Sequence, residues 1–215
     1  MSKSIFITGG ASGLGLVLSE FFASKGYNIY LHYYKTDNIE IVQRKLESYN
    51  IKCTFIYADL TNEVERNNFI DQSTDFIMQS EILINNASIF NNIPFSHCDF
   101  FDLHANYNIH LFVPFLLSKI FTKNNINNKM MINVIDSQLQ NRQSYNHFSY
   151  FLSKNSLQYF TNSLVIEFPK IFFASLLPKI IIKYDSSVRE YIYKTLNDII
   201  KIRNDKLTNN IVKII

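Results

Sequence analysis

The sequence predicts an α/β protein with a single doubly wound parallel sheet of about seven strands and helices on both faces. Along the 215 residues, short β-rich runs alternate with longer segments of helical periodicity. This alternation continues over the chain without an internal repeat or a low-complexity stretch. Strands that alternate with helix-length segments form βαβ units, whose right-handed crossovers place helices on both faces of a sheet. We therefore expect one domain over residues 1–215.

The expected elements follow one another in a regular order. Strands are expected at 4–8, 28–34, 52–58, 81–86, 129–136, 172–177 and 209–215. Helices are expected between them, at 14–25, 38–49, 62–79, 100–123, 147–167 and 186–203. Sheets of this kind bind ligands at the carboxyl ends of their strands, so the residues directly after the strands are the functional candidates.

Composition and charge exclude several classes of protein. The chain is 47% hydrophobic and 18% charged, which argues against disorder, and no stretch approaches the ~18 uncharged apolar residues of a membrane span. A net charge of +3 is too mild for a nucleic-acid binder. Cys53 and Cys98 lack metal-ligand spacing and fit a reducing compartment. With no export leader pattern at its start, we expect a cytoplasmic protein without a metal.

A glycine-rich turn lies between the first strand and the first helix, at residues 8–15 (TGGASGLG). Glycines permit a tight turn and a close approach of the backbone to a ligand. The helix that follows offers unpaired N–H groups and the positive end of its dipole to a pyrophosphate. An ordinary strand-to-helix turn is the alternative, and the context of strand, turn and helix favours dinucleotide binding.

Three further motifs follow the glycine turn in an order typical of one family. Asp59-Leu60 follows the third strand, Asn85-Asn86-Ala87 follows the fourth, and Tyr150-x-x-x-Lys154 lies on the helix after the fifth. Together with the Thr-Gly-x-x-x-Gly-x-Gly turn, they resemble the short-chain dehydrogenase/reductase family, to about residue 180. The resemblance implies a Rossmann-type fold, a nicotinamide cofactor and a small-molecule substrate.

Tyr150 and Lys154 are the candidate catalytic pair, because residues four apart share one face of a helix. A free phenol has a pKa near ~10, and a nearby cation lowers it. We therefore expect a lowered pKa for Tyr150, which acts as general acid toward a C=O or C=N bond reduced by hydride. The resemblance implies that Lys154 also holds the nicotinamide ribose. A surface Tyr/Lys pair is the alternative.

The third catalytic position falls on Asp136 or Ser137. Ser137 lies 13 residues before Tyr150, the separation common in the family, whereas counting from Asn133 in the strand places Asp136 there. We favour Asp136, because strand register is stiffer than loop length. In pteridine reductases and dihydromonapterin reductases an Asp replaces the usual Ser, which implies a proton relay to a pterin nitrogen. A turn residue at the strand end is the alternative for Asp136.

Two stretches resemble the same pterin-reducing branch. Residues 86–90 (NASIF) match its Asn-Ala-Ser-x-Phe, which implies that Ser88 lies near the cofactor phosphate and the pterin and that Phe90 stacks on the pterin. Residues 32–36 (HYYKT) resemble its second-strand end and contain no acid of the kind that binds ribose hydroxyls in an NAD site. Lys35 and Thr36 are therefore expected to bind a 2′-phosphate. A solvated loop lysine and a packing phenylalanine are the alternatives.

His110 occupies the position, four residues before Pro114, where most of the superfamily has an Asn that holds a relay water. Dihydromonapterin reductases resemble this chain in having His there, and His can pass protons near neutral pH. In a shifted register Asn108 takes this role instead.

The chain also departs from the branch. Gly13 stands where these reductases carry an Arg that helps to hold cofactor and pterin. Pro178 is kept from the Pro-Gly after the sixth strand, but the Gly is not. The substrate-loop region, 180–208, is short.

We expect an NADPH-dependent reductase of a dihydropterin such as dihydromonapterin or dihydrofolate, forming a homodimer or homotetramer. A generic carbonyl or alcohol oxidoreductase using Ser137, and a trimmed homologue without turnover, are the alternatives. The expected cofactor-binding residues are Thr8, Gly9, Ser12, Gly13, Leu14, Gly15, Tyr34, Lys35, Thr36, Asp59, Leu60, Asn86, Ala87, Ser88, Tyr150, Lys154 and Pro178. The expected catalytic residues are Tyr150, Lys154, Asp136, Ser137 and His110, and the expected substrate contacts are Ser88, Phe90, Asp136 and Tyr150.

Overall fold

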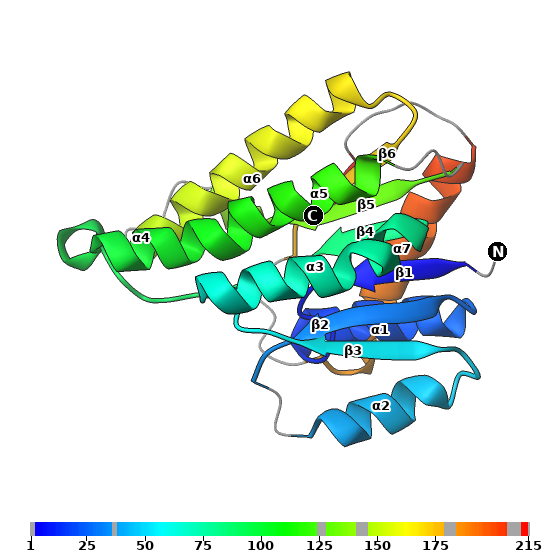
Figure 1. The fold of residues 1–215 in the computed structure, drawn as a ribbon. Coiled ribbons are helices and arrows are strands. Elements are labelled where there is room, and N and C mark those ends of the chain that lie inside the picture. Colours follow the sequence, from blue (N-terminus) through cyan, green and yellow to red (C-terminus); the bar gives the residue numbers. More distant parts are fainter. Residues whose placement is uncertain are drawn as a thin grey trace.

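The computed structural model describes residues 3–35, 38–123, 128–140, 146–178, 184–205 and 212–214. These residues contain a seven-stranded, wholly parallel sheet in the order β3-β2-β1-β4-β5-β6-β7 (Figure 1). The strands are β1 Ser4–Ile7, β2 Asn28–Tyr33, β3 Cys53–Tyr57, β4 Ile82–Asn85, β5 Met130–Val134, β6 Phe172–Leu176 and β7 Val212–Ile214. The predicted fold class is confirmed. The order reverses at β1, which lies between β2 and β4, so the ligand crevice of such a sheet is expected beside β1.

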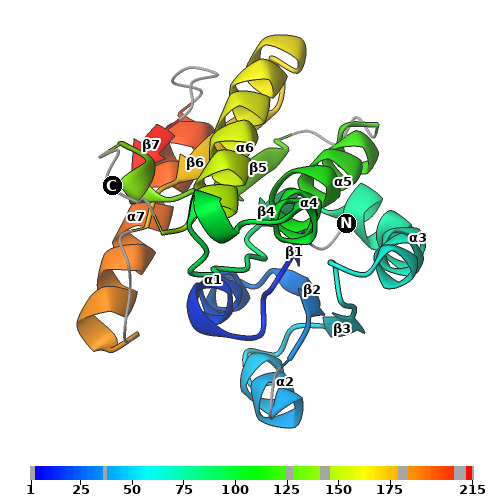
Figure 2. The same ribbon diagram turned by 90° about the vertical axis from the view of Figure 1, so that its left-hand side faces the viewer.

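Helices cover both faces of the sheet (Figure 2). They are α1 Gly13–Ser24, α2 Ile39–Glu47, α3 Glu63–Gln79, α4 Phe100–Tyr107, α5 Val113–Thr122, α6 Phe148–Glu167 and α7 Ser186–Asn204. Short 3-10 turns lie at η1 Phe95–His97 and η3 Ser137–Gln140. α1, α2 and α7 share one apolar core with the sheet, and α3, α5 and α6 share the other. The middle strands β1, β4, β5 and β6 are wholly buried, which explains their continuous apolar sequences.

One expected helix is interrupted. The segment expected to be helical over 100–123 is helical from Phe100 to Thr122, but a π-helical turn, η2 at Asn108–Phe112, separates α4 from α5. In an unbroken α-helix, Pro114 would lack the N–H that bonds the carbonyl of His110, and its ring would clash with that carbonyl. A wider turn accommodates the proline and places His110 within the turn. π-turns of this kind are frequent at functional sites.

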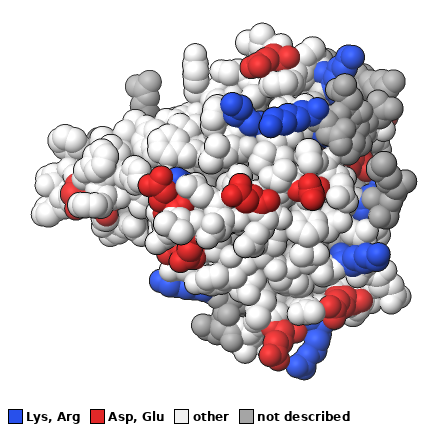
Figure 3. All heavy atoms as spheres, in the orientation of Figure 1, with Lys and Arg blue, Asp and Glu red and all other residues white. Residues whose placement is uncertain are grey.

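Within the expected substrate-loop region, 180–208, the structure describes residues 184–205, which contain α7, and 180–183 and 206–208 lie outside the described residues. Of the strand expected at 209–215, residues 212–214 form β7, which pairs with β6. None of the described helices is long and apolar enough to cross a bilayer. On the face seen in Figure 3, acidic and basic side chains are interspersed.

Candidate active site

The glycine turn packs tightly between β1 and α1. Gly9 and Gly13 have φ angles of 64° and 51°, in the left-handed region that favours glycine. A Cβ on Gly15 would lie 1.9 Å from the carbonyl oxygen of Gly9, so position 15 has no room for a side chain. The turn therefore holds the N-terminus of α1, which stabilises an anion, close to the carboxyl end of β1.

Thr8 and Asn86 join the ends of β1 and β4. The Thr8 hydroxyl oxygen accepts hydrogen bonds of 3.0 Å from the backbone N–H groups of Asn86 and Ala87. The Asn86 side-chain amide donates to the carbonyl oxygens of Thr8 and Gly9, at 2.9 and 3.0 Å. Both side chains bond within the protein, so they shape a ligand site by fixing its backbone.

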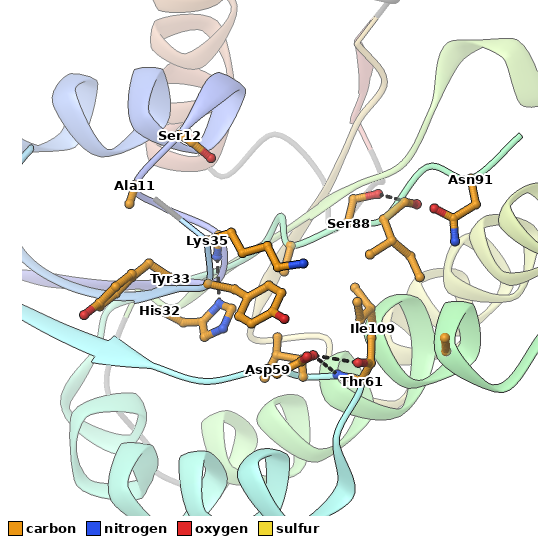
Figure 4. Close-up of a pocket in the computed structure, with 16 residues that line it drawn as sticks. Ala11, Ser12, His32, Tyr33, Lys35, Asp59, Thr61, Ser88, Asn91 and Ile109 are labelled. Carbon is orange, nitrogen blue, oxygen red and sulfur yellow. Dashed lines mark hydrogen bonds between the residues drawn. The ribbon is translucent and has the colours of Figure 1, made fainter. Parts of the chain in front are cut away.

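A cavity of about 420 Å³ opens beside this junction (Figure 4). Its lining includes eight of the predicted cofactor residues: Gly9, Ser12, Tyr34, Lys35, Asp59, Leu60, Ala87 and Ser88. The cavity has the size of a small-molecule site. Lys35 projects among the lining residues in Figure 4, with its Nζ 5.1 Å from the centre of the Tyr34 ring.

Asp59 forms the polar floor of the cavity with its neighbours. Its Oδ1 accepts hydrogen bonds from the N–H and hydroxyl of Thr61, at 2.9 and 2.6 Å. Partial burial raises the pKa of Asp59, but the bonds from Thr61 and from the Tyr34 hydroxyl, with the charge of Lys35, overcome this and lower that pKa. Asp59 is therefore an anion at neutral pH that attracts Lys35 to the cavity.

His32 was not predicted as a site residue, but it connects three segments. Its Nδ1 accepts a 3.1 Å bond from the N–H of Gly9, and its Nε2 lies 2.9 Å from the carbonyl oxygen of Ala58. Burial lowers the pKa of His32 to about 4 despite the bond to Ala58 and the charge of Asp59. A neutral imidazole therefore ties the glycine turn to the end of β3. These bonds could not be predicted from the sequence, because the groups that His32 contacts lie on other segments.

Tyr150 and Asp136 are brought together by α6 and the end of β5. The Tyr150 hydroxyl donates a hydrogen bond of 2.7 Å to Oδ2 of Asp136, and both side chains are buried. Among the described residues the Ser137 side chain makes no such contact. Its backbone N–H bonds the carbonyl oxygen of Pro178 at 3.3 Å. The geometry thus places Asp136, and not Ser137, at the Tyr150 hydroxyl.

The expected lowering of the Tyr150 pKa is wrong. Burial, followed by the negative charge and hydrogen bond of Asp136, raises the pKa of Tyr150, and a bond from Ser88 opposes this only in part. The Lys154 Nζ lies 5.8 Å from the centre of the Tyr150 ring and donates to the carbonyl oxygen of Val134 at 2.8 Å. Tyr150 is thus a neutral phenol, protonated and able to donate.

Lys154 is itself buried. Burial lowers the pKa of Lys154 to about 8, and the charge of Asp136 opposes that shift. The cation therefore belongs to a buried group of charges with Asp136, next to Tyr150.

His110 also reaches the catalytic pair. Its Nε2 lies 2.8 Å from the Ser88 hydroxyl and its Nδ1 2.8 Å from the Ser153 hydroxyl, and its ring stands edge-on to Tyr150 at 5.3 Å. Asn108, the alternative, bonds elsewhere: its Oδ1 accepts a 2.7 Å bond from Arg66 on α3. The π-turn thus directs His110 toward Tyr150 and Asn108 away from it.

Phe90 lies at the mouth of the site. Its ring stands edge-on to Tyr150, with centres 4.7 Å apart, and stacks on His147 at 4.0 Å and 18°. Half of Phe90 is exposed, so an aromatic surface remains open beside the catalytic pair. His147 was not predicted, because nothing in the sequence distinguishes it from the other residues before α6.

The remaining candidates lie around this centre. Gly13 and Leu14 begin α1, where Tyr184 covers the position that a side chain of Gly13 would occupy, 3.7 Å from its Cβ. Tyr184 was not predicted from the sequence. Thr36 lies outside the described residues. Among the described residues, no group of His, Cys, Asp and Glu side chains is arranged to hold a metal.

Comparison with known proteins identifies the class. A family model for short chain dehydrogenases matches residues 3–178. The chain therefore belongs to the short-chain dehydrogenase family.

One curated relative, an uncharacterized oxidoreductase (YhxC) of Bacillus subtilis, is 32% identical over 87 residues, which are 40% of this chain and 30% of that protein. The chain thus spans less than half the length of the first curated relatives that it matches.

Two solved structures share the fold over most of their length. FolM alternative dihydrofolate reductase 1 from Brucella suis, crystallised with NADP, has a TM-score of 0.82 at 22% identity, covering 98% of this chain and 92% of its own. Acetoin dehydrogenase from Enterobacter cloacae has a TM-score of 0.84 at 17% identity, covering 100% and 95%. At these identities the likeness concerns the fold.

Proposed function

We propose that this chain is an NADPH-dependent reductase of a dihydropterin, of the dihydromonapterin or dihydrofolate type. The observation that carries the proposal is the carboxylate of Asp136, 2.7 Å from the Tyr150 hydroxyl, at a position where a simple carbonyl reductase of this family would have a serine. The fold that the chain shares with a dihydrofolate reductase crystallised with NADP supports it.

The residues of the cavity fit such a cofactor. The turn holding Gly9 and Gly15 brings backbone N–H groups and the start of α1 to a diphosphate. Lys35 offers a cation to a 2′-phosphate, and the described end of β2, up to Lys35, carries no acid that would prefer a ribose hydroxyl. Asp59 and Leu60 line the part of the cavity that we assign to the adenine.

The bound NADPH supplies the hydride, and the chain's own residues supply the proton. Reduction of a C=N bond adds hydride to carbon and a proton to nitrogen. Tyr150 is neutral and gives its hydroxyl proton to the nitrogen. Asp136, which holds that hydroxyl, takes part in the proton delivery, and Lys154 balances the phenolate that remains.

Phe90 would form one side of the substrate slot, and the nicotinamide of a bound cofactor would form the other. A flat heteroaromatic ring gains about 1 kcal/mol from offset stacking beyond its burial. His147 supports Phe90 from one face, which leaves the other face for the substrate. Because stacking favours planar rings, this slot selects a pterin over an aliphatic ketone.

A substrate panel tests the proposal. The purified chain is given dihydromonapterin, dihydrofolate and acetoin, each with NADPH and with NADH, and the oxidation of the cofactor is followed by its absorbance. We expect turnover with a dihydropterin and NADPH, and much less with NADH. Turnover of acetoin without turnover of any pterin would identify a generic carbonyl reductase instead. Cofactor binding without any turnover would identify a homologue that only binds nucleotide.

We also propose that the chain forms a homodimer or homotetramer through α5 and α6. These helices expose large apolar residues, including Phe115, Tyr159 and Ile166, of which the last two are 75% and 85% exposed. Exposed apolar groups that gather on one surface mark an interaction site. Sedimentation of the wild type and of Tyr159→Lys tests this: we expect an oligomer that the substitution dissociates, and a monomeric wild type would contradict it.

A further inference from the structure

The completely buried Ser153 lies next to Lys154 on α6 and has no place in the function proposed above. We infer that Ser153 is a positioning residue, which fixes the tautomer of His110 and thereby makes the Ser88 hydroxyl a hydrogen-bond acceptor toward the substrate. The inference rests on the proposed function in one respect, that substrate binds beside Ser88 and Tyr150.

The Ser153 hydroxyl has two neighbours but only one proton. Its Oγ lies 2.8 Å from the backbone carbonyl oxygen of Tyr150 and 2.8 Å from Nδ1 of His110. A carbonyl oxygen can only accept, so the bond to Tyr150 uses the proton of Ser153. The second bond then requires that Nδ1 of His110 carries a proton and donates it to Ser153.

His110 has only one ring proton to place. Its side chain is completely buried, and this burial, together with the charge of Lys154, holds the pKa of His110 well below its usual range. A neutral imidazole protonated at Nδ1 has a bare lone pair at Nε2. That nitrogen lies 2.8 Å from the Ser88 hydroxyl, so Ser88 donates its proton to His110. Two other acceptors lie near Ser88: the carbonyl oxygen of Ile89, more distant at 3.4 Å, and the hydroxyl oxygen of Tyr150, where a bond from Ser88 opposes part of the rise in the Tyr150 pKa. Ser88 has one proton, and it goes to His110, because the lone pair of Nε2 has no other donor in this network of described residues.

This chain of bonds determines what the site offers a substrate. With its proton committed to His110, Ser88 presents only lone pairs, and the Asp136 carboxylate is likewise an acceptor. Tyr150 is then the one donor among these three groups, and its proton bonds Asp136 until it passes to the substrate. Such a set matches a substrate that carries N–H groups beside its reducible bond, as an amino-substituted heterocycle does. A plain ketone has only an accepting oxygen, and it would leave two polar groups of the site without partners.

The tautomer of His110 can be measured without any turnover. We would label the histidines with ¹⁵N, record the ring nitrogen and proton shifts of the NADPH complex, and assign His110 by the signals lost in His110→Gln. The wild type and Ser153→Thr should show the Nδ1–H form. Ser153→Ala should shift His110 toward the Nε2–H form, since Nε2 can then donate to Ser88. A wild type in the Nε2–H form, or an unchanged tautomer in Ser153→Ala, would overturn the inference.

The second readout is substrate preference. In Ser153→Ala the proton of Ser88 becomes free to bond a ketone oxygen, so the ratio of kcat/KM for dihydropterin to that for acetoin should fall by at least about tenfold. Ser153→Thr should restore the ratio. The control is Ser163→Ala on the same helix, whose exposed hydroxyl bonds the Tyr159 carbonyl oxygen and whose loss should change nothing. An equal loss on both substrates in Ser153→Ala would mean that Ser153 is merely structural.

The two failures are distinguishable. If the wild type reduces no pterin, the proposed function fails, while the tautomer measurement still decides the role of Ser153. If it reduces pterins but Ser153→Ala keeps both the tautomer and the substrate ratio, this inference alone fails.

Discussion

Asp136→Asn removes one negative charge beside the Tyr150 hydroxyl and nearly keeps the shape of the side chain. In the wild type, the Tyr150 hydroxyl oxygen and Oδ2 of Asp136 are 2.7 Å apart and both side chains are buried, so the negative charge of Asp136 acts strongly on Tyr150. Without it, the pKa of Tyr150, which Asp136 raises, should move back toward the usual value for a phenol. The phenol would become a stronger acid but lose its partner in proton delivery.

The size of the effect separates two roles of Asp136. A hydrogen bond to a charged group contributes about 1.5–3 kcal/mol and one between neutral groups about 0.5–1.5 kcal/mol. Their difference of roughly 1–1.5 kcal/mol corresponds to about a tenfold change in rate. If Asp136 only orients Tyr150, kcat should fall about tenfold. A group that moves a proton contributes about 10²–10⁴-fold, so we expect kcat in Asp136→Asn to fall by at least about 100-fold.

Steady-state kinetics with dihydropterin and NADPH provides the measurement, with NADPH binding followed by fluorescence to show that the cofactor site is intact. Ser137→Ala is the matched control: it alters the adjacent residue, and we expect less than about a threefold change in kcat. A loss of about tenfold or less in Asp136→Asn, or an equal loss in Ser137→Ala, would refute the proton-delivery role.

Four further predictions concern other parts of the site. Tyr150→Phe should abolish turnover and leave NADPH binding intact, and surviving turnover would remove the assignment of Tyr150 as proton donor. Lys35→Ala should weaken NADPH binding by about tenfold but hardly change NADH binding, whereas an equal loss for both cofactors would exclude a 2′-phosphate contact. Because the pKa of His32 is lowered to about 4, the stability that its neutral form contributes is complete above the unfolded value of ~6.5 and is lost as pH falls toward 4. The free energy of unfolding, measured with urea, should therefore fall by about 3 kcal/mol over that interval. A His32→Gln variant with the same pH dependence would refute this. Gly15→Ala should lower the free energy of unfolding by about 3 kcal/mol or more, because its Cβ would meet backbone atoms. Gly26→Ala is the control: its Cβ would meet nothing within 4 Å, but its φ of 77° is unfavourable, so it should cost about 1 kcal/mol. Equal costs for the two variants would contradict the packing argument.

The sheet could be predicted from the sequence because parallel strands that are buried on both faces have continuous apolar sequences. The expected strand 28–34 is β2, Asn28–Tyr33, and the expected helix 147–167 is α6, Phe148–Glu167. The glycine turn could also be predicted, because the backbone leaves no room for a side chain at positions such as Gly15, so only glycine fits there.

The side-chain network could be predicted only in part. Strand register placed Asp136 next to Tyr150, because β5 is fixed by its neighbours on both sides. The expected effect of Lys154 on the Tyr150 pKa was wrong, because the helix spacing that brings the two together says nothing about the anion and the burial that oppose the cation. Ser153 and His147 gave no signal, since their partners lie on segments far away in the sequence.

The π-turn η2 also makes the fold sensitive to insertions and deletions along this helix. Each residue of an α-helix advances the side chains by about 100° around its axis, so the extra residue in the turn sets the phase of everything after it. Deleting one residue from 108–112 would remove the π-turn and rotate Val113, Leu117 and Phe121, all buried, away from their core. A point substitution at His110 would leave that phase unchanged. The length of this segment is therefore under a stricter constraint than its composition, and an alignment of relatives should preserve the spacing from His110 to Pro114 even where both residues differ.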